Sequence, residues 1–261
     1  MRNAEAAKGI DLERLARDRC EVLKDEPAAR VERIGTGRDI LVRKVYRNRG
    51  LRLLQTFLRR TRAEREHVNL LLAVERSLPC TPPVGYSAHR RLGFAHTSTL
   101  VTRNVPDTTT LKQALSANVN QPLRRRQLIV LLGELLRTAH DAGLLWCTAM
   151  PRNVIVQATA TGPRLLLCDL PAAIIFPGKV PRATSLIDLF DACASKSRCR
   201  EMSRPERFRS LLAYSQNDRP KTQQLWRDLA RRHPLCQRAR KNLVMALRTY
   251  ILKAPRKSPT S

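Results

Sequence analysis

The order of strand-type and helix-type segments is the feature that most restricts the fold of this chain. β-Type runs with their turn signals come early, at 32–46, 84–86 and 98–103. One long helical segment, 54–78, lies among them and ends before Pro79. After Asn104 helical patterns dominate, at 110–117, 122–141 and beyond Pro181, and a strand pair is embedded at 153–157 and 164–169. This order predicts an α+β fold, with a small β-rich part before a mostly helical part.

The charge of the chain is far from balanced. Lys and Arg number 49 against 22 Asp and Glu, which gives a formal net charge of +27. Such a surface attracts phosphate-rich partners, including nucleic acid, anionic lipid headgroups and lipid-linked phosphosugars. Nucleic acid is the less favoured of these, because no helix-turn-helix, zinc-finger or aromatic RNA-binding motif accompanies the charge.

Cysteine spacing and apolar runs bear on the compartment. The seven cysteines are irregularly spaced and form no Cys-x-x-Cys pair, which favours reduced cysteines in a cytoplasmic protein. Residues 1–20 carry charges throughout and do not resemble a signal peptide. The longest apolar patch, 128–136, is interrupted by Gly133 and Glu134 and is too short to span a bilayer. We therefore expect any membrane contact to be peripheral and electrostatic.

Three segments carry a resemblance to a known family. The first is 41–50, in which Lys44 lies in a strand and a basic turn follows. The second is 62–71 and its continuation to Tyr86, and the third is 140–153 and its continuation to Asp169. In order and spacing they resemble the lipopolysaccharide kinase (Kdo/WaaP) family, bacterial kinase-fold enzymes that phosphorylate sugars of the lipopolysaccharide core. The resemblance extends over residues 30–215.

The resemblance implies a two-lobed protein-kinase-like fold that uses ATP and Mg²⁺. On this basis we expect four parts: a helical extension (1–28), a β-rich N-lobe with one long helix (29–104), a mostly helical C-lobe (105–252) and a disordered basic tail (253–261). It also implies a cytoplasmic protein at the inner membrane, with the lipopolysaccharide core or another phosphorylated glycolipid as acceptor.

Lys44 is the first candidate site residue. Strand alternation places it on one face with Val42 and Tyr46, and an inward lysine needs an anionic partner. The resemblance implies that this partner is the α- and β-phosphate pair of ATP, with a helix glutamate holding the ammonium group. A solvated surface lysine is the alternative.

Two glutamates compete for the position beside Lys44. Glu66 shares a helical face with Leu70 and Ala73, whereas Glu64 shares one with Val68 and Leu71. The similarity of the segment Asn69-Leu70-Leu71 to the family pattern favours Glu66.

The turn Gly35-Thr36-Gly37 occupies the position of the kinase glycine-rich loop. It is only a fragment of a Gly-x-Gly-x-x-Gly motif, and a two-glycine turn between strands requires no ligand. If Gly35 and Gly37 do contact phosphate, they offer few backbone N–H groups, so we expect modest nucleotide affinity.

The stretch from His140 to Asn153 resembles a kinase catalytic loop with one change. The resemblance assigns Asn153, and Asp169 after the following strand, to the magnesium ion. It places Thr148 where the catalytic aspartate belongs. An aspartate after a buried strand is also a frequent turn cap, which is the alternative for Asp169.

Thr148 decides the predicted chemistry. A threonine hydroxyl cannot take up a proton at neutral pH, and a general base contributes roughly 10²- to 10⁴-fold to a rate. We therefore expect a divergent family member, a possible pseudokinase, that binds ATP–Mg with weak or absent phosphotransfer. The alternatives are an active kinase of a core sugar, and a binding-only basic scaffold or nucleic-acid-associated protein.

Overall fold

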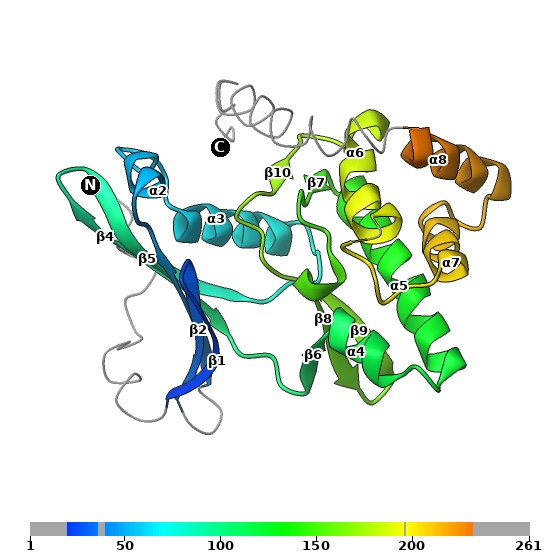
Figure 1. The fold of residues 1–261 in the computed structure, drawn as a ribbon, viewed down its shortest axis with the longest axis horizontal. Coiled ribbons are helices and arrows are strands. Elements are labelled where there is room, and N and C mark those ends of the chain that lie inside the picture. The colour runs from blue at the N-terminus through cyan, green and yellow to red at the C-terminus, as the bar shows by residue number, and fades with distance from the viewer. Residues whose placement is uncertain (1–19, 36–39, 196, 232–261) are drawn as a thin grey trace. The chain divides into compact units, whose positions relative to one another are not determined.

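The computed structural model describes residues 20–35, 40–195 and 197–231, and the chain divides into two compact units. The sheet unit comprises Met1–Thr110 and Asn153–Ala173, and the helical unit comprises Leu111–Arg152 and Ile174–Ser261. The α+β class predicted from the sequence is confirmed, with the larger sheet formed by the N-terminal part and most helices by the C-terminal part (Figure 1). The hairpin 153–173, expected in the C-lobe, belongs to the sheet unit.

A five-stranded antiparallel sheet is the core of the sheet unit. Its strand order is β1-β2-β3-β5-β4, with bounds Cys20–Glu26, Ala29–Ile34, Leu41–Arg47, Phe94–Arg103 and Pro83–Arg91 respectively. Lys44 of β3 pairs with Leu100 of β5, and Ile34, Leu41 and Val101 form an apolar cluster. The helix α3 (Arg62–Glu75) contacts β3, β4 and β5, and one face of it is buried.

Two expectations about this part of the chain are wrong. The helix predicted over 54–78 begins later, as α3, and the short helix α2 (Leu51–Leu54) precedes it. Leu58 between them has a left-handed φ of 50°, and Thr61 caps α3 by accepting the backbone N–H of Glu64. The extension predicted as helical contains β1, since Cys20–Glu26 pairs with β2. Residues 1–19, and the tail predicted as disordered, lie outside the described residues.

The predicted second hairpin is present in a smaller sheet. Strands β8 (Val154–Thr159) and β9 (Gly162–Leu167) pair in an antiparallel manner, and β6 (Thr108–Thr110) adds to the other edge of β8. A parallel bridge between Cys80 and Leu167 connects this sheet to the segment after α3. The hairpin is thereby attached to the unit that contains β3 and α3.

The helical unit is built around α5 (Pro122–Asp141). Its other helices are α4 (Leu111–Ala117), α6 (Arg182–Leu189), a π-helix (Phe190–Ala194), α7 (Arg204–Tyr214) and α8 (Arg219–Arg231). The short strands β7 (Leu144–Leu145) and β10 (Ile174–Ile175) pair with each other, and a 3-10 helix spans Pro151–Asn153. α5 and α7 approach closely at Gly133, where an added Cβ would lie 2.1 Å from the backbone oxygen of Ser210.

No helix among the described residues is both long enough and apolar enough to cross a membrane. The six described cysteines are free thiols, and Cys80, Cys147, Cys193 and Cys199 are buried.

Candidate functional site

Lys44 lies between two carboxylates in the sheet unit. Its Nζ is 3.3 Å from both carboxylate oxygens of Glu66 and 2.6 Å from Oδ1 of Asp169. The three residues come from β3, α3 and the segment after β9, so the fold joins positions that are up to 125 residues apart. Glu64, the rival for the position beside Lys44, instead forms an ion pair with Arg60 at 3.5 Å.

The surroundings of Glu66 explain why it faces Lys44. Glu66 lies on the buried face of α3 with Leu70 and Ala73, and its residue exposure is only 3%. The hydroxyl of Tyr46, two residues after Lys44 on the same face of β3, donates a hydrogen bond to Glu66. Sequence reasoning placed Tyr46 on this face but missed its contact with the glutamate.

Burial and charge pairing set the protonation of this group. Burial raises the pKa of Glu66, although Lys44 opposes the rise. Burial would lower the pKa of Lys44, but Glu66 and Asp169 outweigh it, so the pKa lies well above the usual range. The Lys44 ammonium group is therefore positively charged at neutral pH.

Asn153 and Asp169 lie at the same end of the β8–β9 hairpin. Val154 pairs with Leu167, and the Cys168 thiol just beyond that pair lies 2.9 Å from the backbone oxygen of Asn153. Asp169 has a left-handed φ of 59°, which is uncommon for a residue other than glycine, and its side chain is 30% exposed. Asn153, which has an amide side chain, and Asp169, which has a carboxylate, are thus brought to the same end of the hairpin.

Asp169 and Asn153 are the residues that could hold a magnesium ion bound together with a nucleotide. No group of three or more His, Cys, Asp or Glu side chains that could hold a metal ion occurs in the described part of the chain. Magnesium is commonly held by one or two carboxylates together with substrate phosphates and water, rather than by a cage of protein ligands. Asp169, with Asn153 beside it, fits that kind of site.

The glycine turn is only partly described. Gly35 follows β2 with a φ of 94°, a conformation that favours glycine, and Gly37 lies outside the described residues. A phosphate-binding role for Gly35 and Gly37 stays a prediction.

In the helical unit, Asp188 holds the loop that contains Thr148. The backbone N–H groups of Trp146 and Cys147 each donate to Asp188 at 2.7 Å, and the Nε2 atom of His140 lies 3.1 Å from the same carboxylate. Asp188 is completely buried on α6. Sequence reasoning gave it no role, although an aspartate within the apolar run 186–189 was a usable signal. Thr148 itself is half-buried, with its backbone oxygen accepting from the N–H of Met150.

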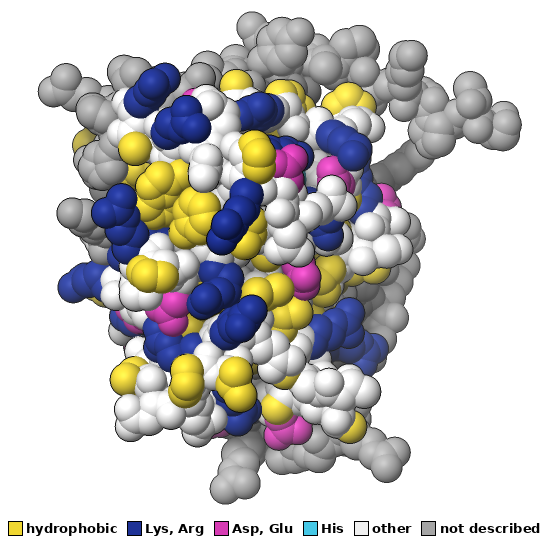
Figure 2. Space-filling model, turned by 90° about the vertical axis from the view of Figure 1, so that its right-hand side faces the viewer, with side chains coloured by type: hydrophobic (Ala, Val, Ile, Leu, Met, Phe, Trp, Pro, Cys, Tyr) yellow, Lys and Arg dark blue, Asp and Glu magenta, His cyan; other side chains and the backbone are white. Residues whose placement is uncertain are grey.

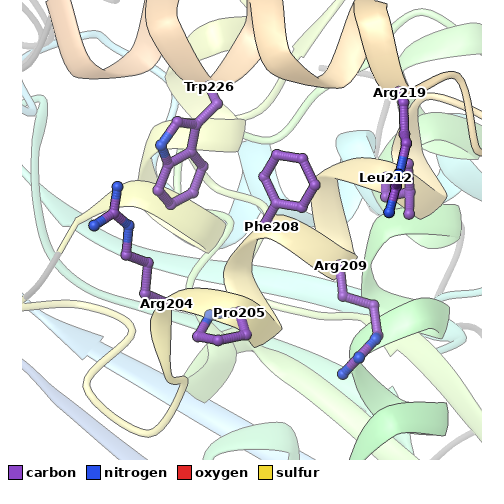
Figure 3. Close-up of a pocket in the computed structure, with 7 residues that line it drawn as sticks. All are labelled: Arg204, Pro205, Phe208, Arg209, Leu212, Arg219 and Trp226. Carbon is purple, nitrogen blue, oxygen red and sulfur yellow. The ribbon is translucent and has the colours of Figure 1, made fainter.

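A cavity of about 540 Å³ lies between α7 and α8 in the helical unit (Figure 3). Trp226 and Phe208 meet edge to face with ring centroids 6.0 Å apart, and the Arg204 guanidinium lies 5.9 Å from the Trp226 ring. The rest of the lining is Pro205, Arg209, Leu212 and Arg219. The lining has no carboxylate, imidazole or thiol, so the cavity offers neither a general base nor a metal ligand.

Figure 2 shows a face of the molecule on which Lys and Arg far outnumber acidic side chains and apolar side chains lie between them.

The comparisons with known proteins decide the family. The sequence model of the lipopolysaccharide kinase (Kdo/WaaP) family matches residues 10–175, a range that contains Lys44, Glu66, Asn153 and Asp169. The chain belongs to this family. The cavity between α7 and α8 lies beyond the range that matches the family.

The solved structure of WaaP confirms the fold. WaaP in complex with acyl carrier protein superimposes with a TM-score of 0.59 at 16% identity, over 88% of this chain and 91% of WaaP. The kinase domain of PknI from Mycobacterium tuberculosis gives a TM-score of 0.41 at 15% identity, over 58% of this chain and 56% of that domain. No curated protein matches the sequence. At this identity the likeness to WaaP establishes the fold and not the activity.

Proposed function

We propose that the chain is a divergent lipopolysaccharide-kinase-family protein that binds ATP–Mg, with weak or absent phosphotransfer. The observation that carries the proposal is the buried pairing of Lys44 with Glu66, which fixes a charged ammonium group next to Asp169. A buried lysine–glutamate pair contributes little net stability in most proteins, so its presence calls for a function of the ammonium group.

The geometry suggests how a nucleotide enters this arrangement. Lys44 contacts Asp169 at 2.6 Å, and Asp169 is the more exposed of its two carboxylate partners. Lys44 would hold the phosphates of ATP in place of Asp169, and Glu66 would keep the ammonium group in position from the buried side. Asp169 and Asn153 would hold the magnesium ion, whose charge would stabilise the phosphates.

The acceptor side of the reaction lacks its base. Asp188 fixes the backbone of the loop through two N–H groups, but Thr148 offers only a hydroxyl where a carboxylate would accept the acceptor proton. Positioning and metal electrostatics supply most of the catalysis of phosphoryl transfer. We therefore expect the loss of the base to lower the rate without abolishing the reaction.

Thermal melting with ATP and Mg²⁺ tests nucleotide binding. At a ligand concentration of about 100 times Kd, binding stabilises by about 2.7 kcal/mol, which for a chain of this size raises Tm by roughly 5–10 °C. Lys44→Met removes the shift, whereas Lys24→Met, the same change at an exposed lysine of β1, keeps it. No shift for the wild type refutes the proposal.

The metal role has its own matched control. Asp169→Ala makes the ATP shift independent of Mg²⁺. Asp107→Ala leaves the shift intact, although Asp107 has a similarly left-handed φ of 54° and is exposed. If both changes alter the ATP-induced Tm shift equally, the effect of Asp169→Ala comes from its left-handed backbone position and not from the loss of a metal ligand.

A phosphate-transfer assay on lipopolysaccharide separates weak activity from the alternative of an active core-sugar kinase. Thr148→Asp is expected to raise the rate roughly 10²- to 10⁴-fold, and Asp169→Ala to abolish it. A fast wild-type rate that Thr148→Asp does not increase, and that Asp169→Ala abolishes, supports the active kinase instead.

The net charge of +27 supports the proposed setting. We place the protein in the cytoplasm in peripheral contact with an anionic membrane, where a phosphorylated glycolipid such as the lipopolysaccharide core would be its acceptor. A binding-only scaffold or nucleic-acid-associated protein is the less favoured alternative. Tight, sequence-tolerant DNA binding at physiological salt, with no ATP shift, would favour it.

A further inference from the structure

Five exposed apolar side chains gather at one place in the sheet unit, and we refer to them as the leucine knob. Four leucines have most of their surface exposed: Leu51 is 78% exposed, Leu54 60%, Leu58 78% and Leu92 84%, and Phe57 is 48% exposed. They come from α2, the segment after it and the β4–β5 turn, which lie side by side (Figure 1). The backbone N–H of Leu58 donates to the oxygen of Gly93 at 3.2 Å.

The knob has a fixed shape. The guanidinium of Arg90 donates to the backbone oxygens of Thr56 and Gly93, at 3.2 and 3.1 Å, and also to that of Arg59. The rings of Phe57 and Phe94 lie 4.8 Å apart. These contacts join the backbone segments of the knob to one another, while the leucine side chains stay exposed.

Two leucines of the knob occupy backbone positions that do not suit leucine. Leu92 and Gly93 form the two-residue turn between β4 and β5, with φ values of 51° and 82°. Such turns favour Asn, Asp or Gly at the first position. Leu58 has a φ of 50°, which is also unfavourable for a bulky residue. Both side chains are largely exposed, so neither burial nor backbone preference explains why leucine occupies these two positions.

The charge around the knob has one sign. No Asp or Glu occurs in residues 47–63 or 83–103. Exposed arginines flank the knob on every contributing segment, at positions 49, 52, 59, 60, 90 and 91. Of these, Arg60 has an ion pair with Glu64, and Arg90 is used to hold the backbone. The other four form no ion pair with any described residue.

We propose that the leucine knob docks the protein on an anionic membrane surface. The leucines enter the boundary between headgroups and acyl chains, and the surrounding arginines bind the lipid phosphates. The side chains project from the surface instead of lining a groove, which suits a fluid apolar layer better than a partner helix. The excess of arginine opposes docking of a second copy of the chain. The inference rests on the peripheral membrane contact proposed above and adds the residues that make it.

Vesicle binding tests the proposal by comparing two matched double variants. Leu51→Asp/Leu58→Asp changes two knob leucines, and Leu123→Asp/Val119→Asp makes the same change in charge at side chains that are 80% and 64% exposed in the helical unit. Co-sedimentation uses vesicles of equimolar phosphatidylglycerol and phosphatidylcholine at physiological ionic strength. The knob variant should lose about 100-fold in affinity, about tenfold for each leucine, and the control less than about threefold.

The outcomes separate this inference from the proposals on which it builds. An equal loss in both double variants overturns the knob and leaves a purely electrostatic membrane contact. No binding of the wild type to these vesicles overturns both the knob and the peripheral contact, while the ATP melting test is unaffected. Unchanged vesicle binding, with loss of self-association of the knob variant in size-exclusion chromatography, assigns the knob to an interface between copies instead.

Leu92→Asn provides a readout in which stability and binding change in opposite directions. Asparagine suits the left-handed turn position, so Tm should rise, while vesicle affinity should fall about tenfold with the loss of one inserted leucine. A variant that gains stability and keeps full vesicle affinity shows that Leu92 does not enter the membrane, and overturns its place in the knob.

Discussion

Replacement of Lys44 by methionine tests the energetic reasoning about the candidate site without any ligand. Once Lys44 is gone, the Tyr46 hydroxyl is the one side-chain hydrogen-bond partner that the described residues give Glu66, which is 3% exposed, whereas the Asp169 side chain is 30% exposed and accessible to solvent. Leaving one member of a buried pair without its partner costs about 3–5 kcal/mol. The remaining Tyr46 hydrogen bond places the expected loss near the lower limit, about 3 kcal/mol, at about pH 8.

The loss should depend on pH with a defined sign. Burial already raises the pKa of Glu66 above the ordinary 4.5, and removal of Lys44 raises it further. A carboxyl group with a raised pKa in the folded state favours folding at low pH, and this contribution is lost as the pH rises through the folded pKa. The destabilisation relative to the wild type should therefore shrink by up to about 1.4 kcal/mol per pH unit between the folded pKa of Glu66 in the variant and its lower folded pKa in the wild type.

Urea denaturation followed by circular dichroism measures this dependence between about pH 5 and pH 8. The double variant Lys44→Met/Glu66→Gln removes both charges and should be less destabilised at about pH 8 than Lys44→Met alone. Lys24→Met should change the free energy of unfolding by less than about 0.5 kcal/mol. A Lys44→Met loss below about 1 kcal/mol, or one that is equal at both ends of the pH range, refutes the buried-pair reasoning.

Three further changes probe the helical unit, each by urea denaturation. Gly133→Ala should cost about 1–3 kcal/mol, because its Cβ would lie 2.1 Å from a backbone oxygen of α7, whereas Gly178→Ala, with nothing within 4 Å, should have little effect. Asp188→Asn should cost about 2–3 kcal/mol, since an amide cannot accept from both loop N–H groups and the imidazole together, and a smaller loss would show that the loop does not depend on its charge. Burial raises the pKa of Glu206, but the hydrogen bonds that its carboxylate accepts from Arg125 and from the backbone N–H of Ser203, the cap of α7, outweigh burial and lower the pKa. Glu206→Gln should therefore cost about 1–2 kcal/mol at neutral pH, and the difference from wild type should vanish as the pH falls below 4.5.

Local patterns in the sequence were sufficient for the class of the fold and for the faces on which Lys44 and Tyr46 lie, whereas the family resemblance was needed to choose Glu66 over Glu64. Alternation put Lys44 and Tyr46 on one face of a strand, and helical periodicity put Glu66 on the apolar face of α3. The segment lengths and turn residues predicted the β8–β9 hairpin. These features follow from backbone periodicity, which depends only on neighbouring residues.

The tertiary structure decided the features that depend on contacts between distant residues. The segment 55–61 reads as helix, yet it breaks where Phe57 packs on Phe94 and Thr61 caps α3. β1 exists because β2 lies beside it, and its sequence has no strong strand pattern. Tertiary context overrides local propensity in both cases, because packing and pairing with a distant segment contribute more than propensity.

The same division holds for function. From the sequence, and from the family resemblance that it carries, we predicted a nucleotide site that includes Lys44 and Glu66, with Thr148 at the position of the base, and these roles stay predictions. Only the tertiary structure showed that Asp169 contacts the same ammonium group as Glu66, that Asp188 holds the Thr148 loop, and that Leu58 and Leu92 lie on one knob. Side chains from distant segments come into contact only when the chain folds, so local sequence patterns do not predict these contacts.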